Sequence, residues 1–530
     1  MSAPHSYNLL VKPWIPVTWR NDAAEPREPK VGITEALQRS RDIRSISHTS
    51  PFIEFGLYRL LITIVLDAYI VAGRRPTIGK MKQMLALGFG SCVYKYLDDY
   101  KHGFDLWNDD NRFLQPKPID DTKAGPVANL FSAVPSGANV IHWHHFLEDE
   151  DDAPAVGAAA SRISEEEAAQ WLTTVSPFTF KGKYGAARTL AGDPPIYALV
   201  LGRSLFETLV LNLPRPSGRV TAKQELERGA SWRTTPDFAE TKLPTLAEGF
   251  TWPVRYIRLE RGRDAITKSI YAVAFKKTKE TKINAPVYDV KYGWRDPNAG
   301  TVTTKDKIDH ITAKGDVLMW RDLVHLYLIA GEGEALRAKE RRSRPEVISN
   351  ALRLLDTAQF RVAAYGMRKN PDKDAKVDEW FRSVLMFPTE VARDSRLSSR
   401  AINAFNRTQK VADSLRNALR MLRAPAKTKE TSRKVLHQTE ADALNHFWRR
   451  LELPLAGTYL EALRGGEHEA EQRLWTVIRR EARDAFTLAT GPQRRTADGL
   501  FRIANAANWL EKRLKTIELS VIKVRKEKKS

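Results

Sequence analysis

The sequence predicts an α+β protein in two parts: a large mixed N-terminal domain over residues 1–385 and an antiparallel four-helix bundle over residues 386–530. Three observations support this prediction. Short apolar runs of strand length alternate with helical patterns in the N-terminal part. Apolar residues recur at gaps of three and four in the C-terminal part. The chain has 530 residues, of which 42% are hydrophobic, so it can bury more than one core.

The C-terminal part contains four apolar stripes at helical spacing. The longest stripe consists of Leu500, Ile503, Ala507, Leu510, Leu514, Ile517 and Val521. Shorter stripes lie within residues 411–422, 444–451 and 474–486. Turn-forming residues at 424–429, 453–457 and 490–493 separate them. Four helices with short connections predict an antiparallel bundle.

The N-terminal part has a mixed pattern. Runs rich in β-branched and aromatic residues predict strands within 7–17, 195–202, 250–260 and 269–277. Helical patterns occupy 34–39, 52–72, 204–213 and 320–330, and a further helix is expected to begin near Ser164. Residues 368–373 are expected to form a polar turn between two apolar helices.

Composition narrows the class of protein. The chain carries 85 Lys and Arg against 64 Asp and Glu, a net charge of +21, and residues 391–530 contribute 30 cations against 16 anions, or +14. Such a field attracts polyanions, and nucleic acid is the default candidate for a binding partner.

The single cysteine, Cys92, is expected to be a small buried residue and excludes an intramolecular disulfide framework. The apolar run 57–73 contains Arg59 and Asp67 and is too short to span a bilayer. With no secretion signal recognised, a cytoplasmic location is expected.

Residues 142–145 read His-Trp-His-His and follow a Gly- and Asn-containing loop. Three imidazoles suggest a metal site, but in an extended segment His142 and His144 point to one side and His145 to the other, and the sequence contains no HExxH or CxxC motif. An aromatic residue flanked by hydrogen-bonding side chains is also how loops enter a DNA groove. An ordinary core tryptophan at Trp143 remains a third interpretation.

Three further segments suit contact with phosphates. Residues 180–188 combine two glycines with three cations around Tyr184, but match neither the P-loop nor the dinucleotide-binding pattern. Lys276 and Lys277 leave a predicted strand together, and residues 368–373 form a polar turn. Each segment is equally compatible with a solvated loop. The acidic run 149–152 suits solvation better than two-metal catalysis, and the sequence shows no nucleophile elbow or kinase motif.

Taken in order, several segments resemble the CasA family, the large subunit of the type I-E CRISPR Cascade surveillance complex. They are YNLLVKPWIPV (7–17), SGANVIHWHH (136–145), FKGKYGAAR (180–188), GDPPIYALVLGRSLFETLVLNLP (192–214), GFTWPVRYIRLE (249–260) and AYGMRKN (364–370) before VLMFP (384–388). The resemblance spans nearly the whole chain.

The resemblance implies a non-enzymatic DNA-binding subunit without a cofactor. Such a subunit reads the protospacer-adjacent motif (PAM) as duplex, starts strand separation for R-loop formation and helps to recruit a helicase-nuclease in antiviral defence. Implied partners are target DNA, the displaced strand, and the backbone and small subunits of the complex that contains the CRISPR RNA. The cysteine zinc site that some family members carry cannot exist in a chain with one cysteine.

The resemblance also assigns residues. The motif-contacting loop corresponds to Trp143, His144 and His145, with Trp where the family usually has Phe. The family's glycine loop corresponds to Lys181, Gly182, Lys183, Tyr184 and Gly185, and its minor-groove lysine to Lys276 or Lys277. The strand-separating wedge corresponds to Arg368, Lys369 and Asn370, with Asn-Pro where the family has Asn-Gln. Two alternatives stay open: a metal-dependent nuclease or phosphoesterase built on His142 and His144, and a basic nucleic-acid-binding scaffold that does not read sequence.

Overall fold

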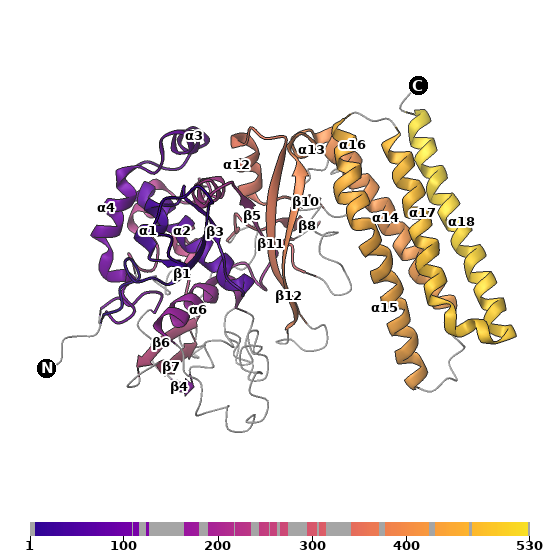
Figure 1. Ribbon diagram of the computed structural model, residues 1–530, viewed down its shortest axis with the longest axis horizontal. Coiled ribbons are helices and arrows are strands. Elements are labelled where there is room, and N and C mark those ends of the chain that lie inside the picture. The colour runs from indigo at the N-terminus through magenta and orange to yellow at the C-terminus, as the bar shows by residue number, and fades with distance from the viewer. Residues whose placement is uncertain are drawn as a thin grey trace. The chain divides into compact units, whose positions relative to one another are not determined.

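The computed structural model describes residues 6–108, 110–115, 123–126, 164–179, 189–216, 218–234, 243–253, 255–261, 266–273, 294–304, 307–313, 341–369, 377–422, 430–465 and 469–527 (Figure 1). The chain divides into two compact units. One contains residues 1–315, 339–356 and 361–384, and the other contains 316–338, 357–360 and 385–530. The described part combines helices with small sheets, as the mixed pattern predicts.

The N-terminal unit is built around helix α2 (Pro51–Val71), whose residues from Pro51 to Ile70 are all buried. Ser50 precedes the helix and Pro51 takes its first position, where the missing N–H costs nothing. A helix that is apolar all round belongs in a core. The predicted range 52–72 is therefore right to within one residue, and α2 is the central helix of this unit.

The helices around α2 include α4 (Ser91–Asp99), α6 (Glu165–Phe178), α7 (Leu205–Leu211), α8 (Ala222–Glu227) and α9 (Leu246–Phe250). Helix α6 starts as predicted, because Ser164 and Glu167 form a reciprocal capping box. The other described helices of this unit include α1 (Ile33–Gln38), α3 (Ile78–Leu87), α12 (Glu346–Leu354) and the 3-10 turn η1 (Lys101–Phe104).

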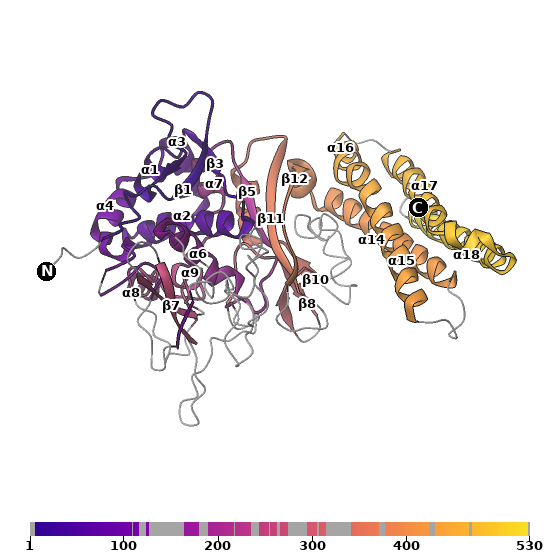
Figure 2. The same cartoon turned by 60° about the horizontal axis from the view of Figure 1, so that its bottom comes forward.

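One described sheet has the order β12-β11-β5, from β12 (Val377–Pro388), β11 (Gln359–Lys369) and β5 (Tyr197–Leu201) (Figures 1 and 2). Arg368 therefore lies at the end of a strand, and the expectation of a turn between two helices is wrong. Residues Val362 to Met367 are buried on both faces. Such a strand shows no alternation, so its sequence resembles a buried helix.

Three more described sheets are antiparallel. They have the orders β2-β1-β3, β4-β7-β6 and β10-β8-β9. Their strands are β1 (Ile15–Trp19), β2 (Lys30–Val31), β3 (Ile43–Ile46), β4 (Lys123–Pro126), β6 (Arg255–Arg261), β7 (Ile266–Val273), β8 (Thr301–Thr303), β9 (Ile308–His310) and β10 (Arg341–Ser343). The predicted strands in 7–17, 195–202, 250–260 and 269–277 each overlap one of these or β5, with different bounds. The predicted helix 320–330 lies outside the described residues.

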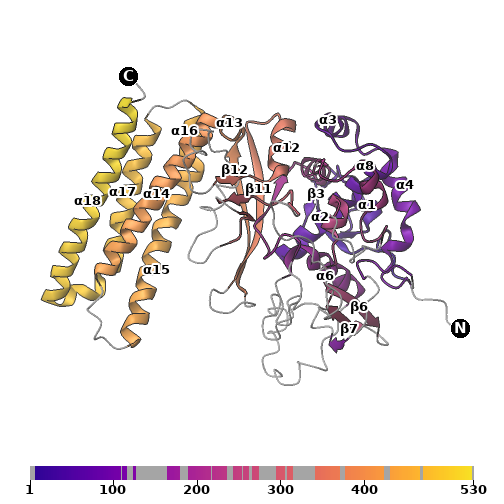
Figure 3. The same ribbon diagram turned by 180° about the vertical axis from the view of Figure 1, so that it is seen from behind.

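The second unit contains α13 (Thr389–Arg393), α14 (Ser395–Met421), α15 (Glu430–Glu452), α16 (Leu460–Arg464), α17 (Ala470–Ala489) and α18 (Ala497–Glu527). Helix α14 packs against α15, α17 and α18, and α15 packs against α17 (Figure 3). Buried apolar side chains such as Leu415, Phe447, Ile478 and Leu510 fill the space between them. The four long helices coincide with the four predicted stripes.

Two local predictions in this unit are wrong. The expected turn at 453–457 is a π-helical turn, η4 (Leu453–Tyr459), which joins α15 to α16 without a break. Pro454 stands in its first turn, where a proline is tolerated best. Leu500 belongs to the predicted buried stripe but is 53% exposed. It lies in the first turn of α18, just after the 3-10 turn η5 (Gly491–Arg495), which packs against that helix.

Two further predictions concern the helix break at 490–493 and the burial of Cys92. The predicted break at 490–493 falls at η5, between α17 and α18. The expectation of a buried cysteine is wrong, because Cys92 is only half-buried. It occupies the first turn of α4, where the end of the helix leaves one side of the residue uncovered.

Candidate nucleic-acid interface

Most of the predicted DNA-contacting residues lie outside the described part of the chain. They are Trp143, His144, His145, Lys181, Gly182, Lys183, Tyr184, Gly185, Lys276, Lys277 and Asn370. Arg368 and Lys369 are the last two residues of β11. The structure does describe the residues at which several of these segments begin and end. The candidate site is therefore built from those anchoring residues.

Segment 180–188 begins and ends at a buried base. The Thr189 backbone N–H donates to the Thr179 carbonyl over 3.2 Å, which joins the residues on either side of the segment. The Thr189 hydroxyl donates to the Gly192 carbonyl over 2.8 Å. Gly192 has φ +90°, a conformation that favours glycine. The two ends of the predicted glycine loop therefore lie together a few residues before β5.

Strand β5 is flanked on both edges near this base. Tyr197 pairs with Tyr365 of β11 on one edge and forms a bridge with Ala299 on the other. The Ala198 N–H donates to the Asn298 carbonyl over 2.7 Å, and the Asn298 amide donates back to the Ala198 carbonyl over 2.9 Å. Residues 294–299 are the first described residues after the segment that carries Lys276 and Lys277.

The antiparallel register sets the direction of β11. Since Arg361 pairs with Leu201 and Tyr365 pairs with Tyr197, the residues of β11 beyond Tyr365 continue past the N-terminal end of β5. Arg368 and Lys369 are among them. Strand β11, the base of segment 180–188 and residues 294–299 thus meet around one end of β5, and Arg368 and Lys369 follow three and four residues beyond the Tyr365–Tyr197 pair.

A cluster of four aromatic side chains packs beside this meeting point. The Phe55 ring of α2 stacks on Tyr197 with centroids 4.7 Å apart, and lies 5.3 Å from Tyr365 and 5.6 Å from Phe178. Phe178 ends α6, immediately before Thr179. All four aromatic side chains are buried. Such pairs add to the free energy of apolar burial, so Phe55 fixes three segments against α2 at once.

A buried ion pair attaches residues 294–299 to α2. Arg59 Nη2 lies 2.5 Å from Asp296 Oδ2, and the two side chains are only 5% and 2% exposed. The Arg59 guanidinium also lies 4.5 Å from the ring centroid of Phe250 and 4.8 Å from that of Tyr197. Removing either charge would leave its partner buried without compensation.

A second ionic contact holds β11 and β12. The Tyr365 hydroxyl donates to Glu54 Oε1 over 2.8 Å, and Arg382 Nε lies 2.9 Å from Glu54 Oε2. Burial raises the pKa of the Glu54 carboxyl, although the neighbouring Arg382 charge opposes the shift. Glu54 therefore binds both strands whose connection contains Asn370.

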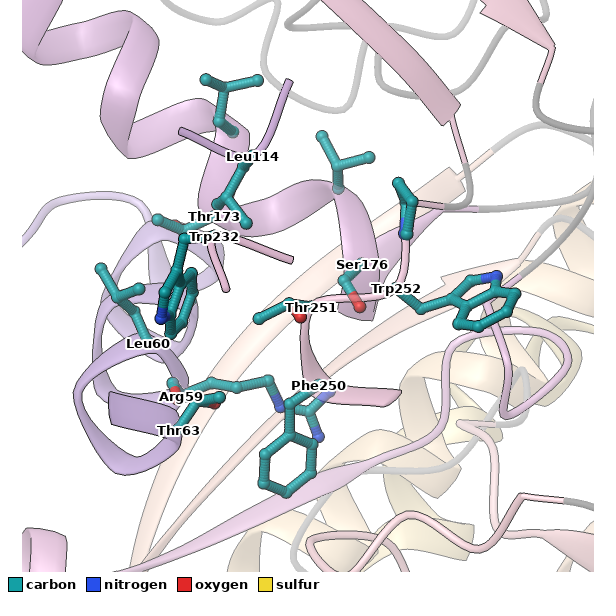
Figure 4. A pocket seen from close by; sticks show the side chains of 14 residues that line it. Arg59, Leu60, Thr63, Leu114, Thr173, Ser176, Trp232, Phe250, Thr251 and Trp252 are labelled. Atoms are coloured by element: carbon teal, nitrogen blue, oxygen red, sulfur yellow. Dashed lines mark hydrogen bonds between the residues drawn. The ribbon is translucent and has the colours of Figure 1, made fainter. Parts of the chain in front are cut away.

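A small cavity of about 30 Å³ adjoins Arg59 (Figure 4). Thr173, Ser176 and Thr251 supply hydroxyl groups to its lining, with Trp232 and Trp252 among the apolar walls. This volume accommodates about one or two water molecules and is too small for a nucleotide. The cavity is therefore a candidate hydration site beside the ion pair.

The sequence reasoning missed the anchoring role of the charged residues in α2. Glu54, Arg59 and Asp67 are all buried in a helix that is otherwise almost wholly apolar. Asp67 accepts two bonds from Arg233, of 2.9 and 3.0 Å, and one from the Tyr96 hydroxyl of 2.6 Å. A buried charge requires a partner, so isolated charges inside an apolar helix were the available signal.

A second candidate surface lies on α18. Arg502, Trp509 and Arg513 are spaced by seven and four residues and so share one face of the helix. The Arg513 guanidinium lies 5.2 Å from the Trp509 ring centroid, and Lys512 beside it is exposed. Phe501 is 67% exposed. Aromatic rings interleaved with cations are typical of surfaces that bind single-stranded nucleic acid.

Ion pairs between helices account for many of the acidic residues in this unit. Arg483 and Glu511 form two bonds of 2.6 and 2.8 Å between α17 and α18. Other pairs of this kind join Glu471 to Arg400, Glu481 to Arg450, and Glu440 to Arg416 and Arg420. These carboxylates form ion pairs between neighbouring helices. Fewer acidic side chains are then left to offset the cations on the outer surface, which favours a positive surface charge.

The described ranges contain neither a metal-binding cluster nor a membrane-spanning helix. No three His, Cys, Asp or Glu side chains there lie close enough to hold a metal ion. His142 and His144 are not among the described residues. No helix in the described part is long and apolar enough to cross a membrane.

Comparison with known proteins gives consistent matches. The model of the family described as CRISPR-associated protein Cse1 matches residues 8–487. CasA/Cse1 of Thermus thermophilus is 27% identical over 268 residues, which are 49% of this chain and 50% of that protein, so the match spans about half the length of this curated relative. The crystal structure of Thermus thermophilus CasA superposes with a TM-score of 0.72 at 19% identity, covering 97% of this chain and 100% of that one. A chain of a structure described as a CRISPR RNA-guided surveillance complex gives a TM-score of 0.62 at 19% identity, covering 97% and 100%. Because the family model matches nearly the whole length of this sequence, the chain belongs to the Cse1 (CasA) family of CRISPR-associated proteins.

Proposed function

We propose that this chain is the non-catalytic large subunit of a cytoplasmic, RNA-guided CRISPR surveillance complex. In this role it recognises the protospacer-adjacent motif in duplex DNA, starts unwinding for R-loop formation and helps to recruit a helicase-nuclease. Family membership and the structural likeness to a chain of such a complex support the proposal. The guide RNA then reads the target sequence by base pairing.

The observation that carries the proposal is the meeting of three chain segments near the start of β5. Segment 180–188 closes between Thr179 and Thr189, the 294–299 stretch pairs with Ala198, and β11 runs past Tyr197 toward Arg368. Motif reading requires several loops to contact the same few base pairs. A rigid base reduces the entropy that these loops lose on binding DNA.

Within this arrangement we assign motif contacts to Trp143, His144 and His145, to Lys181 through Gly185, and to Lys276 or Lys277. The connection between β11 and β12, with Arg368, Lys369 and Asn370, serves as the strand wedge. Unstacking one base step costs a few kcal/mol, which contacts to the DNA backbone must offset. The buried Glu54 contacts to Tyr365 and Arg382 give this hairpin a firm attachment.

We further infer that residues 1–385 act as the motif-reading domain and that α14, α15, α17 and α18 form a basic four-helix bundle within residues 386–530. The bundle contacts the displaced single strand through the partly exposed face of α18 that carries Trp509 and Arg513, with Trp509 stacking on bases and Arg513, with Arg502 on the same face, near phosphates. The same unit contacts other subunits of the complex.

The test uses the full chain assembled with its guide-RNA complex. Duplexes with a randomised flank are bound, and the bound fraction is sequenced. We expect a flank of two or three bases to be enriched by the native complex and lost with Trp143→Ala. Lys223→Ala serves as the control, because Lys223 is 83% exposed on α8, where it pairs with its helical neighbour Glu227.

Each outcome decides between the open alternatives. Enrichment that survives Trp143→Ala and Lys183→Ala would contradict the motif-reading assignment. Salt-sensitive binding without any enriched flank would favour a basic scaffold. DNA cleavage by the purified chain with Mg²⁺ or Mn²⁺, abolished by His144→Ala, would favour the nuclease.

A further inference from the structure

Arginine residues from three chain segments lie near the first turn of α12 in the N-terminal unit. Helix α12 begins at Glu346 and packs against β5 (Figure 1). Arg344 stands two residues before the helix, and its Nε donates to the Ser349 hydroxyl over 2.9 Å. The Arg215 backbone N–H donates to Glu346 Oε1 over 3.1 Å. The segment that follows α7 is therefore attached to the same turn as Arg344.

A backbone hydrogen bond brings the third segment to this turn. The Val347 N–H donates to the Pro297 carbonyl over 3.1 Å. Arg295 lies two residues before Pro297 and is exposed. Arg219, four residues after Arg215, is also exposed, and the Arg295 charge is one of those that act on its guanidinium. The two exposed cations are thus neighbours, although they are distant in sequence.

The positive charges of this group repel one another. Burial lowers the pKa of Arg344 to about 10, and the nearby Arg353 charge acts in the same direction. Desolvation lowers the pKa of Arg219, and the Arg295 charge again adds to the shift. Arg215 Nε is buried and has no hydrogen-bond partner among the described residues. An anion bound between the guanidinium groups would offset the repulsion and supply hydrogen-bond acceptors.

We propose that this arginine cluster binds backbone phosphates of a nucleic acid. The cluster consists of Arg215, Arg219, Arg295, Arg344 and Arg353. The exposed side chains, those of Arg219, Arg295 and Arg353, contact the phosphates. Guanidinium groups suit this role because they donate paired hydrogen bonds to phosphate oxygens. The two less exposed arginines add positive potential, of which Glu346 offsets part. The inference rests on the proposed function for the source of the phosphate, and none of the five arginines is assigned there to motif reading.

The first test is thermal unfolding of the full chain in increasing inorganic phosphate, compared with NaCl at equal ionic strength. Phosphate should raise the unfolding temperature of the native chain more than NaCl does, because it binds the folded state. We expect Arg295→Gln and Arg353→Gln each to weaken the apparent phosphate affinity by about tenfold. Arg203→Gln is the charge-matched control, because Arg203 is 78% exposed and pairs with Glu207. Equal phosphate responses in all four chains would overturn the inference.

The second test identifies the source of the phosphate, using complexes assembled with the full chain. If the source is duplex DNA, Arg295→Gln should lower the slope of log K against log salt by about 0.9 for every DNA sequence. If the source is the guide RNA, the variant should instead weaken assembly onto the RNA-containing complex by about tenfold, with the DNA slope unchanged. A response to inorganic phosphate without either effect would mean an adventitious ion only, and would overturn the inference.

Failure of the proposed function gives a different result. The enriched flank reports motif reading, and Arg295→Gln should leave that flank unchanged. Absence of any enriched flank in the native complex would refute motif reading, while the two phosphate measurements would still decide the role of the arginine cluster.

Discussion

The Tyr365 hydroxyl of β11 donates a hydrogen bond of 2.8 Å to Glu54 Oε1 of α2, across 311 residues of sequence. Arg382 of β12 contacts the other oxygen of the same carboxylate. A single buried side chain of the central helix therefore holds both strands of the hairpin that contains the proposed wedge. These contacts attach the hairpin to α2.

Replacing Glu54 should weaken this attachment. Glu54→Leu leaves the buried Tyr365 hydroxyl without its acceptor and Arg382 without its counter-ion, and we expect a loss of about 1–3 kcal/mol in the free energy of unfolding. Glu54→Gln keeps an acceptor for Tyr365 and should lose less. Hydrogen exchange of the β11 and β12 amides is the measurement. Equal protection in Glu54→Leu and the native chain would contradict the attachment.

Gly366 allows β11 to approach the aromatic side chain of β12 closely. A Cβ at this position would meet Phe381 Cζ at less than any normal contact distance. We expect Gly366→Ala to cost about 1–3 kcal/mol through overpacking. Thermal unfolding of the purified chain measures the effect.

The double variant Gly366→Ala/Phe381→Leu is the rescue experiment, because the smaller side chain removes the clash. Gly491→Ala is the control, since a Cβ there would meet no described atom within 4 Å. A Gly366→Ala chain as stable as the control would show that β12 accommodates the methyl group without cost.

Asp67 should be among the most sensitive positions of the N-terminal unit. Its carboxylate is fully buried between Arg233 and Tyr96, and Asp67→Ala leaves the 6%-exposed guanidinium without a charge partner. Breaking a buried pair in this way costs about 3–5 kcal/mol. Lys95→Ala removes one partner of the exposed pair with Asp99 and should cost less than about 1 kcal/mol. The unfolding midpoints of the two variants are compared, and similar shifts would refute the difference in burial.

The stability of the N-terminal unit should depend on pH through His310. Because burial lowers the pKa of this imidazole below 6.5, the unfolded chain binds its proton more readily than the folded chain does. The contribution is complete above pH 6.5 and is lost as the pH falls toward the folded pKa, with a slope of up to about 1.4 kcal/mol per pH unit. His310→Gln should show a shallower decline of unfolding midpoint between pH 7 and 5. Identical slopes would show that folding does not change the pKa of His310.

The face of α18 should bind single-stranded DNA without sequence preference. Arg513→Gln in the assembled complex should weaken binding equally for all sequences. It should also lower the slope of log K against log salt by about 0.7 for the lost phosphate contact. Trp509→Ala should weaken binding without changing that slope. Lys223→Gln is the charge-matched control on α8. A sequence-dependent loss with Arg513→Gln would contradict this assignment.

Local patterns predicted much of the secondary structure. The range of α2, the start of α6 after Ser164 and the positions of the long C-terminal helices all follow from apolar spacing and capping residues. These features depend on neighbours within a few turns of the chain. The ordered set of short motifs was likewise enough to predict the Cse1 family, which the family match confirms.

Features that depend on distant residues were not predictable. The residues before Arg368 were expected to form a helix because a strand covered on both faces loses its alternation, and only pairing with β5 and β12 decides their state. The exposure of Leu500 depends on where the neighbouring helices end. The arrangement of the candidate site likewise depends on residues that are distant in sequence, so local patterns did not predict it.

The sequence by itself determined the segments that carry cations and aromatic residues, because residue type is a local property. Only the tertiary structure decided that Thr179, Thr189 and Asp296 lie around one end of β5, packed against α2 through Phe55 and Arg59. Most of these contacts join residues more than a hundred positions apart. Long-range contacts of this kind are selected by the packing of the whole core, which no local pattern encodes.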